Sequence, residues 1–308
     1  MSAPTPSASS RPAPLGAAVA ALDLRQVRRR KSRLELALYR GIERGCALFG
    51  GRRWYRWRHL AAGRFLERHE TIELPDLPAA LDGLVLAQLS DLHAGAFLGE
   101  GDLADVVARV RELDVDLVAL TGDYITHAGS DADALLSDLA GLRARLGCFA
   151  VFGNHDYRGR LEDGIARGFG EVGIRVLRDE CARLEVGDAT LALTGLEDLE
   201  EAKRIDVERA RAALRPGDVE VVLCHNPAGA PGLARAGCAL VLSGHTHGGQ
   251  IVVPFLPRLG PHHPGDRVQH GPTTLVVSRG LGVLGVPLRI GAPAELVVVT
   301  LRRAAVEA

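Results

Sequence analysis

This 308-residue sequence lacks both a long hydrophobic run and a cysteine pair. Its five cysteines are odd in number, scattered and free of any CxxC spacing, which argues against a disulfide framework or a cysteine zinc site and for a reducing compartment. The apolar stretch LGAAVAAL (residues 15–22) is too short to span a bilayer. The arginine run follows this stretch instead of preceding it, and the segment beyond is too charged for a twin-arginine export signal. We therefore expect a cytoplasmic protein.

A large net charge is also absent, since the chain carries −1, but the charge is spread unevenly. Residues 1–68 carry a net charge of +11, and the remaining 240 residues carry −12. A basic head on an acidic body indicates that the head has an anionic partner of its own. With 47% hydrophobic and 24% charged residues, the composition excludes disordered, fibrous and collagen-like chains.

The basic head divides into two parts. Residues 1–22 are rich in Ser, Pro and Ala and are predicted to be disordered. Residues 23–68 are predicted to form a basic amphipathic segment, with one helix over 24–48 and a second over 52–68, after a glycine pair. The apolar residues of the first helix recur every four positions: Leu34, Leu38 and Ile42.

Both tryptophans of the chain, Trp54 and Trp57, lie among arginines in this head. Arginines attract anionic lipid headgroups and indole rings settle at the interface, so residues 24–68 suit a membrane surface. The alternative is a solvated basic helix that packs its Trp and Leu side chains onto the main domain. A nucleic-acid-binding arm is disfavoured, because the body is acidic and no nucleic-acid-binding module is visible.

From residue 69 the pattern changes to short apolar runs that alternate with helical stretches. The predicted strands cover 84–90, 116–122, 148–153, 190–195, 219–224, 238–244, 273–278 and 294–301. The predicted helices cover 101–113, 131–146, 160–172, 205–214 and 227–236. This alternation indicates one α/β domain over residues 69–303, and its strand-rich final third indicates a second sheet.

Five of the predicted strands are followed directly by Asp, His or Asn. In α/β sheets, reactive side chains collect beyond the carboxyl ends of strands. The residues at these positions are Asp91, His93, Asp123, Asn154, His155, Asp156, His225, His245 and His247. Carboxylate, imidazole and amide groups suit divalent metals such as Mn, Fe and Zn.

The spacing within these blocks also fits two neighbouring ions. If the segments are extended, residues i and i+2 point the same way, so Asp91 and His93 converge on one ion. His245 and His247 can then serve one ion each, and the two oxygens of Asp123 can bridge the pair. Each block alone has a structural explanation as a helix cap or a turn. The ordered set of five favours the metal site.

The chain resembles the calcineurin-like metallophosphoesterase superfamily, whose five blocks DxH, GD, GNHD/E, H and GHxH occur here in order over about residues 69–302. It is most similar to the bacterial YaeI/YkuE-like phosphodiesterase subfamily in the stretches LPAALDGLVLAQLSDLHAG, GHTHGGQIVVP and SRGLGVLGVPLRIGAPAEL. IGAPAEL departs from that subfamily, which often has a Pro-Pro pair there. The resemblance implies a four-layer α/β/β/α sandwich.

The resemblance also implies a role for each block. One metal is expected on Asp91, His93, Asp123 and His247. The other is expected on Asp123, Asn154, His225 and His245, with Asp123 bridging. His155 matches the catalytic histidine, which Asp156 is expected to orient. Arg279 and Arg289 are candidates for phosphate binding, with ordinary surface ion pairs as the alternative.

We therefore expect a hydrolase that uses two divalent metal ions to cleave a phosphodiester or pyrophosphate bond. The basic head favours a membrane-associated, lipid-linked or nucleotide-linked substrate, with the enzyme peripheral on the inner face of the cytoplasmic membrane. The alternatives are a phosphomonoesterase or phosphoprotein phosphatase on the same metal centre, and a non-catalytic membrane-bound scaffold.

Overall fold

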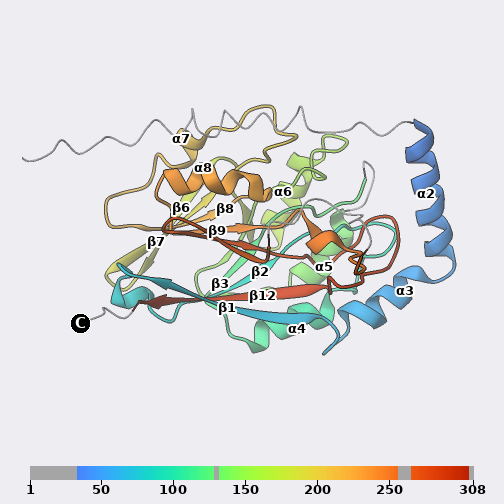
Figure 1. Ribbon diagram of the computed structural model, residues 1–308, viewed down its shortest axis with the longest axis horizontal. Helices are drawn as coiled ribbons and strands as arrows, with labels where there is room; N and C mark the ends of the chain where they lie inside the picture. The colour runs from blue at the N-terminus through green and yellow to red at the C-terminus, as the bar shows by residue number, and fades with distance from the viewer. Residues whose placement is uncertain (1–32, 128–131, 256–264, 305–308) are drawn as a thin grey trace, which may run out of the picture.

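The computed structural model describes residues 33–127, 132–255 and 265–304. The disorder predicted for residues 1–22 therefore falls outside the described residues, as does the start of the first predicted helix. Two six-stranded sheets pack against each other, with helices on their outer sides (Figure 1).

The first sheet has the strand order β1-β12-β2-β3-β4-β5. Its strands are β1 (Leu66–Leu74), β12 (Glu295–Arg303), β2 (Val85–Leu89), β3 (Leu117–Leu120), β4 (Cys148–Ala150) and β5 (Ile174–Val176). Strands β2 to β5 run parallel, whereas β12 pairs antiparallel with β2 and parallel with β1.

The second sheet has the order β10-β11-β9-β8-β7-β6. Its strands are β10 (Arg267–His270), β11 (Thr273–Val277), β9 (Leu240–Ser243), β8 (Val219–Leu223), β7 (Ala189–Gly195) and β6 (Glu180–Val186). Strands β7, β8, β9 and β11 run parallel, and the two edge strands are antiparallel to their neighbours.

Short helices cover the outer face of each sheet. Against the first sheet lie α4 (Ala104–Glu112), η4 (Ala132–Leu135), α5 (Leu136–Leu139) and α6 (Glu162–Glu171). Against the second lie α7 (Val207–Ala210), η5 (Pro227–Gly229) and α8 (Ala230–Arg235). The remaining short helices are η3 (Ala79–Leu81) and η6 (His247–Gly249).

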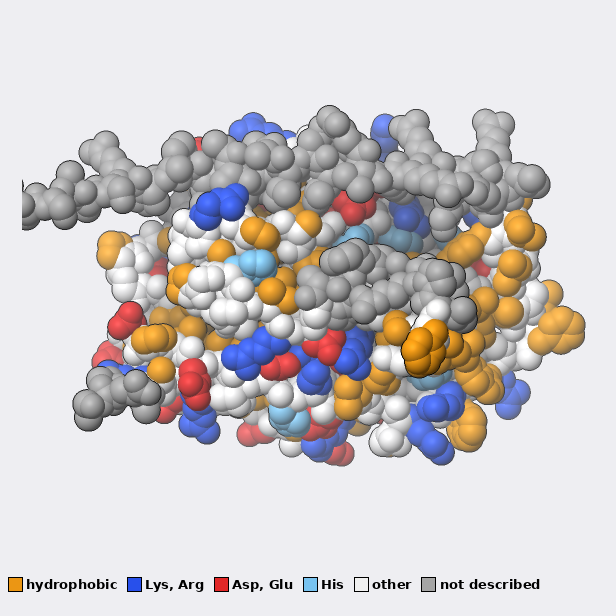
Figure 2. All heavy atoms as spheres, viewed as in Figure 1, with side chains coloured by type: hydrophobic (Ala, Val, Ile, Leu, Met, Phe, Trp, Pro, Cys, Tyr) orange, Lys and Arg blue, Asp and Glu red, His pale blue; other side chains and the backbone are white. Residues whose placement is uncertain are grey.

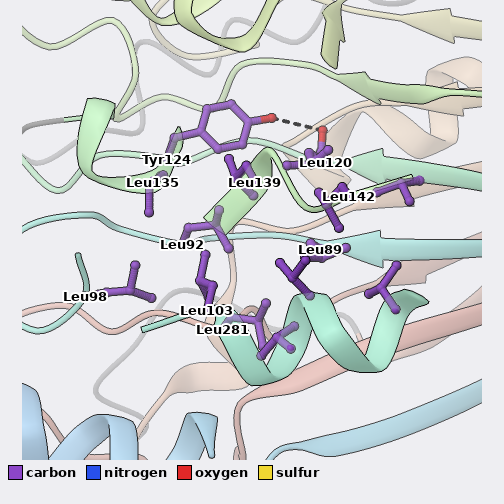
Figure 3. Close-up of a cluster of buried hydrophobic side chains, with 14 of the residues drawn as sticks. Leu89, Leu92, Leu98, Leu103, Leu120, Tyr124, Leu135, Leu139, Leu142 and Leu281 are labelled. Atoms are coloured by element: carbon purple, nitrogen blue, oxygen red, sulfur yellow. Dashed lines mark hydrogen bonds between the residues drawn. The ribbon is translucent and has the colours of Figure 1, made fainter. Parts of the chain in front are cut away.

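Three apolar layers hold the sandwich together. Strand side chains alternate between faces, so in β2 Leu86 enters the core between the sheets, while its neighbour Ala87 enters the core under the helices. Figure 3 shows part of that outer core, where the hydroxyl of Tyr124 also donates to the carbonyl of Leu120 at 3.1 Å. A third cluster lies between the second sheet and its helices. The predicted α/β/β/α sandwich is confirmed.

The N-terminal segment forms α2 (Arg33–Leu48), α3 (Gly51–Tyr55) and η2 (Arg56–Leu60), all ahead of β1. The helix predicted over 52–68 is wrong beyond Leu60, because the backbone turns extended at Ala61 and β1 begins at Leu66. The sequence LERHETIEL alternates with period two and buries Ile72 and Leu74, which suits a strand better than a helix.

Three further strands, β5, β6 and β10, were also not predicted from the sequence. All three are edge strands; polar and apolar residues mix in β6 and β10, and β5 has three residues. The helices predicted over 131–146 and 205–214 shrink to short turns, although their apolar residues recur at helical spacing. The first ends at Leu139, two residues ahead of Gly141.

Candidate metal centre

The residues predicted from the strand ends meet at one edge of the sandwich. They come after β2, β3 and β4 of the first sheet and β8 and β9 of the second, whose carboxyl ends share that edge. Gln88 links the two sheets there, because its side-chain amide donates to the carbonyl of Ser243 on β9 at 2.9 Å. All nine residues are at most 7% exposed except His245, whose side chain is 19% exposed.

The sequence-based prediction assumed an extended backbone at the paired positions, but the backbone there is left-handed. Five of the residues have φ between 50° and 72°: Asp91, His93, Asp123, His245 and His247. For residues with a Cβ, the left-handed region costs about 1–2 kcal/mol each. Such strain gathers where a functional site requires it. The predicted extended i, i+2 geometry is therefore wrong at Asp91, His93, His245 and His247, whose side chains reach the cluster from left-handed backbone.

The first group consists of Asp91, His93, Asp123 and His247, one ligand atom of each lying within 4.8 Å of the others. The Nε2 atoms of His93 and His247 lie 3.0 Å apart, and their rings are stacked. Nε2 of His247 is also 3.4 Å from Oδ1 of Asp91. Two carboxylates and two imidazole nitrogens thus point at one position.

The second group consists of Asp123, His225 and His245, again with ligand atoms within 4.8 Å. The amide oxygen of Asn154 joins it, at 3.1 Å from Nδ1 of His245. Asp123 belongs to both groups, and its Oδ2 lies 3.6 Å from Nε2 of His93 and 3.4 Å from Nε2 of His225. This oxygen therefore occupies the bridging position between the groups.

The residues fit a pair of divalent cations. Nε2 of His225 is buried and has no hydrogen-bond partner among the described residues, while its Nδ1 is held by the carbonyl of Thr121 at 2.6 Å. A buried, unpaired ring nitrogen beside a carboxylate is what a metal ligand requires. His93 is held in the same way, with Nδ1 at 3.3 Å from the carbonyl of Ile125.

Protonation in the cluster is set by burial and by its own charges. Burial raises the pKa of Asp91 to about 6 and lowers the pKa of His93 to about 4. Burial also lowers the pKa of His155 and His247 well below 6.5. Their imidazoles are therefore neutral near pH 7, and the neutral ring is the form that binds metals. Burial raises the pKa of Asp123, but the charge of His225 outweighs it and holds that pKa well below its usual value.

His155 lies beside this cluster and is held by a backbone carbonyl. Its Nδ1 is 2.8 Å from the oxygen of Thr126, and its ring stands edge-on to that of His93 with centroids 4.7 Å apart. Its backbone amide donates to Oδ1 of Asp123 at 2.8 Å. A proton on Nδ1 leaves Nε2 as the nitrogen available to a substrate.

Asp156 does not orient His155, in contrast to the prediction from the sequence. One of its oxygens accepts the amides of Gly153 at 2.8 Å and Asp123 at 2.9 Å. The other accepts the amides of Tyr124 at 2.7 Å and Ile125 at 3.3 Å. Burial and the charge of Asp123 raise the pKa of Asp156, but a carboxyl proton on either oxygen would point at a donor. This geometry favours the carboxylate, which ties the turn after β3 to the turn after β4.

Glycines allow the strand ends to approach this closely. A Cβ at Gly244 would overlap Ser90 and the carboxylate of Asp91, and one at Gly153 would overlap the carboxylate of Asp123. The glycine before each of these two ligand blocks is therefore required by packing against a ligand from a neighbouring strand.

The two arginines predicted to bind phosphate are occupied within the protein. The buried guanidinium of Arg289 donates to the carbonyls of Gly282, Ala292 and Arg279 and to the hydroxyl of Tyr55. Arg279 pairs with Asp266 and lies 3.7 Å from Glu295. Arg279 therefore matches the ion-pair alternative. Arg289 matches neither expectation, because it is buried against carbonyls and lies 3.4 Å from Nδ1 of His247.

The turn after β7 also reaches the cluster, although it was not predicted to be part of the site. It carries acidic residues in the stretch GLEDLEE, and Glu200 lies 3.3 Å from Nε2 of His245. The strand before this turn was predicted, so its acidic end was the signal available. Arg158 was also missed, and it donates at 2.9 Å to the Thr126 carbonyl that holds His155.

Helix α2 packs against this edge of the sandwich. Oε2 of Glu43, a buried residue, lies 2.8 Å from Nε2 of His127, the residue after Thr126. The Tyr39 ring packs so closely on Gly285 that a Cβ there would lie 2.7 Å from it. The head is thus attached beside the metal cluster.

Comparison with known proteins gives a consistent result. The calcineurin-like phosphoesterase profile matches residues 84–249. The uncharacterized metallophosphoesterase YkuE of Bacillus subtilis is 31% identical over 253 residues, covering 78% of this chain and 88% of its own length. An uncharacterized metallophosphoesterase of Helicobacter pylori is 32% identical over 251 residues, covering 79% of this chain and 66% of its own.

A transmembrane protein with metallophosphoesterase domain from Danio rerio is also 31% identical over 250 residues, which is 76% of this chain. The match spans 57% of that relative's length.

Proposed function

This chain belongs to the calcineurin-like phosphoesterase family, and we propose that it is a dinuclear-metal-dependent hydrolase that cleaves a phosphodiester or pyrophosphate bond. The observation that carries the proposal is the position of Asp123, whose Oδ2 lies between Nε2 of His93 and Nε2 of His225. Two ligand groups that share one carboxylate oxygen suit a pair of ions a few ångströms apart. Mn, Fe and Zn all suit this donor set.

The metal ions, His155 and Asp156 have different roles in the proposed hydrolysis. Two divalent cations held there would activate a water molecule and neutralise charge on the phosphoryl group. His155 is proposed to protonate the leaving oxygen from Nε2. Because the Thr126 carbonyl already accepts the Nδ1 proton, this step requires a second proton on the ring, which is neutral near pH 7 before substrate binds. Asp156 acts indirectly, since it fixes the backbone that carries Asp123.

We further propose that the basic head binds an anionic membrane, so that the substrate is lipid-linked or nucleotide-linked and the enzyme works at the inner face of the cytoplasmic membrane. Large apolar side chains of the head face solvent in place of packing onto the domain. Their exposed fractions are Leu38 65%, Ile42 47%, Leu48 85%, Phe49 94%, Trp54 41% and Trp57 58%. Figure 2 shows hydrophobic side chains gathered at the end of the molecule where α2 and α3 lie.

The exposed side chains favour the membrane surface over the packed helix as the role of the head. A helix that merely covers the domain would bury its Leu and Trp side chains. Leu60 is buried, but Leu38, Leu48 and both tryptophans are exposed. Exposed apolar residues interleaved with arginines suit a bilayer interface. Among the described residues no helix has the length and apolarity needed to cross a membrane, so binding through them would be peripheral.

The reaction type is tested with three substrates. The manganese-loaded chain is compared on bis(p-nitrophenyl) phosphate, p-nitrophenyl phosphate and a nucleoside diphosphate ester, with Asp123→Ala as the blank. We expect the diester or the pyrophosphate to be preferred in kcat/KM. A preference for the monoester would instead support a phosphomonoesterase or phosphoprotein phosphatase. Screening a membrane-lipid extract with the same pair of proteins identifies the natural substrate class.

Membrane binding is tested by flotation with vesicles of phosphatidylcholine alone or mixed with phosphatidylglycerol. We expect the wild-type chain to float only with the anionic vesicles. Leu48→Asp with Phe49→Asp should abolish flotation, because two exposed apolar side chains become negatively charged. Substitutions at such exposed positions should leave the fold intact. Ala212→Asp with Ala213→Asp adds the same charge at exposed positions after α7 and serves as the control. A wild-type chain that stays unbound would rule out the membrane proposal.

A further inference from the structure

The turn after β7 reaches the second ligand group. Oε1 of Glu200 lies 3.3 Å from Nε2 of His245 and accepts a hydrogen bond from the side-chain amide of Asn226 at 2.9 Å. Asn226 is the residue after His225 and also caps η5 through the amide of Ala228. Glu200 is therefore held in place by the same strand end that supplies His225.

The two nitrogens of His245 have different partners, and this settles which of them faces the metal position. Nδ1 lies 3.1 Å from Oδ1 of Asn154, which belongs to the same ligand group. A histidine that binds a metal through one nitrogen carries a proton on the other, and that N–H needs an acceptor. Nε2 has the carboxylate of Glu200 in this position.

Two other histidines of the cluster, His93 and His225, use a weaker acceptor, whereas Nδ1 of His247 lies 3.4 Å from the guanidinium of Arg289. Nδ1 of His93 faces the carbonyl of Ile125, and Nδ1 of His225 faces the carbonyl of Thr121. A carboxylate raises the basicity of the ligating imidazole more than a neutral carbonyl does, because the hydrogen bond is charge-assisted.

The charges of the two groups explain why such a partner is needed at His245. The first group holds two carboxylates, Asp91 and Asp123, whereas the second holds only the shared Asp123 beside the neutral Asn154. Glu200 supplies the missing negative charge next to the second group without being one of its ligands.

A second acidic residue fixes this turn. Asp198 is 1% exposed, and one of its oxygens accepts the amides of Glu200 at 2.9 Å and Glu201 at 2.8 Å. Its other oxygen is buried without a hydrogen-bond partner among the described residues. The turn thus brings a buried carboxylate and a half-buried one to the side of the cluster that has fewer ligand charges.

We propose that Glu200 is a positioning residue for the second metal ion, which it serves by orienting His245 and strengthening it as a ligand. The inference rests on the metal centre of the proposed function and is independent of the substrate. Removal of such a partner typically weakens metal binding by about 10- to 100-fold.

The test is metal binding to the full chain, measured by calorimetry with Mn²⁺ and by visible absorption with Co²⁺. In Glu200→Gln we expect the second ion to bind about 10- to 100-fold more weakly, with the first ion unchanged. The absorption of the second Co²⁺ equivalent should change as well. Glu200→Asp keeps the charge and should recover part of the affinity. Glu208→Gln, at an exposed position in α7, makes the same chemical change as a control.

The outcomes separate this inference from its alternatives. Unchanged affinity and absorption in Glu200→Gln would overturn it. Complete loss of the second ion in a variant whose metal-free melting temperature is unchanged would also overturn it, because Glu200 would then be a ligand. A wild-type chain that binds two ions but hydrolyses no phosphoester would refute the proposed function while leaving the role of Glu200 standing.

Discussion

Replacement of Asp156 by asparagine should destabilise the whole fold, not only slow the chemistry. The side chain is fully buried, and its two oxygens accept four backbone amides from the turns after β3 and β4. Asparagine keeps one oxygen but places an NH₂ group where the other was. Two of the four amides then face a donor.

The size of the effect can be worked from those two amides. A buried N–H left without an acceptor costs about 1–3 kcal/mol, so the pair should cost about 2–6 kcal/mol. That is a large part of the roughly 5–15 kcal/mol by which a domain is typically stable. The turn that carries Asp123 should also loosen, because the amide of Asp123 is one of the four donors.

The assay is urea unfolding of the metal-free chain, together with melting in the presence of Mn²⁺. Asp188→Asn lies in the exposed turn between β6 and β7 and should stay within about 0.5 kcal/mol of the wild type. If Asp156→Asn leaves the free energy of unfolding within about 1 kcal/mol of the wild type and lowers only kcat, our reasoning is wrong. Asp156 would then act on His155, as the sequence had indicated.

Three further predictions concern the cluster itself. His155→Ala should keep both metal ions in elemental analysis and slow hydrolysis about 10²- to 10⁴-fold, whereas loss of metal would make His155 a ligand. Burial lowers the pKa of His225, but the charge of Asp123 outweighs it and holds that pKa well above 6.5. The imidazole is then protonated at pH 7 without metal, and binding should release about one proton. Calorimetry in two buffers of different ionisation enthalpy checks this, and no release would contradict it. Gly244→Ala should abolish metal binding at the first group, because the added Cβ overlaps Asp91. Gly164→Ala, whose Cβ meets open space in α6, should bind metal normally. Equal metal content in the two variants would count against this packing argument.

The sequence was a good guide wherever a functional residue comes directly after a buried strand. Parallel strands bring their carboxyl ends to one edge within each sheet. The resemblance to the family then implied that the blocks of both sheets meet, with Asp91, Asp123 and Asn154 from one and His225 and His247 from the other. The prediction does not depend on the exact backbone path. The predicted meeting of these residues therefore holds although Asp91 and His93 are left-handed and not extended.

The sequence was a poor guide to residues that act through a neighbour. Asp156 was assigned to His155 because the two are adjacent, yet its partners are amides up to 33 positions away. Glu200 lies 45 positions before His245 and within a run of acidic residues that resembles a solvated surface turn. No periodicity marks such pairs, because the contact is created only when two strand ends are brought together.

The sequence by itself thus determined the α/β character, the family and the residues that converge on the cluster, because these are set by strand-length apolar runs and by the residue types directly after them. The tertiary structure alone decided which carboxylate serves which histidine, that Arg279 and Arg289 are occupied within the protein, and that the apolar side chains of α2 face solvent. The physical reason is that hydrogen-bond partners and burial depend on which surfaces pack together. The same sequence is compatible with a side chain that faces solvent or one that faces the protein interior.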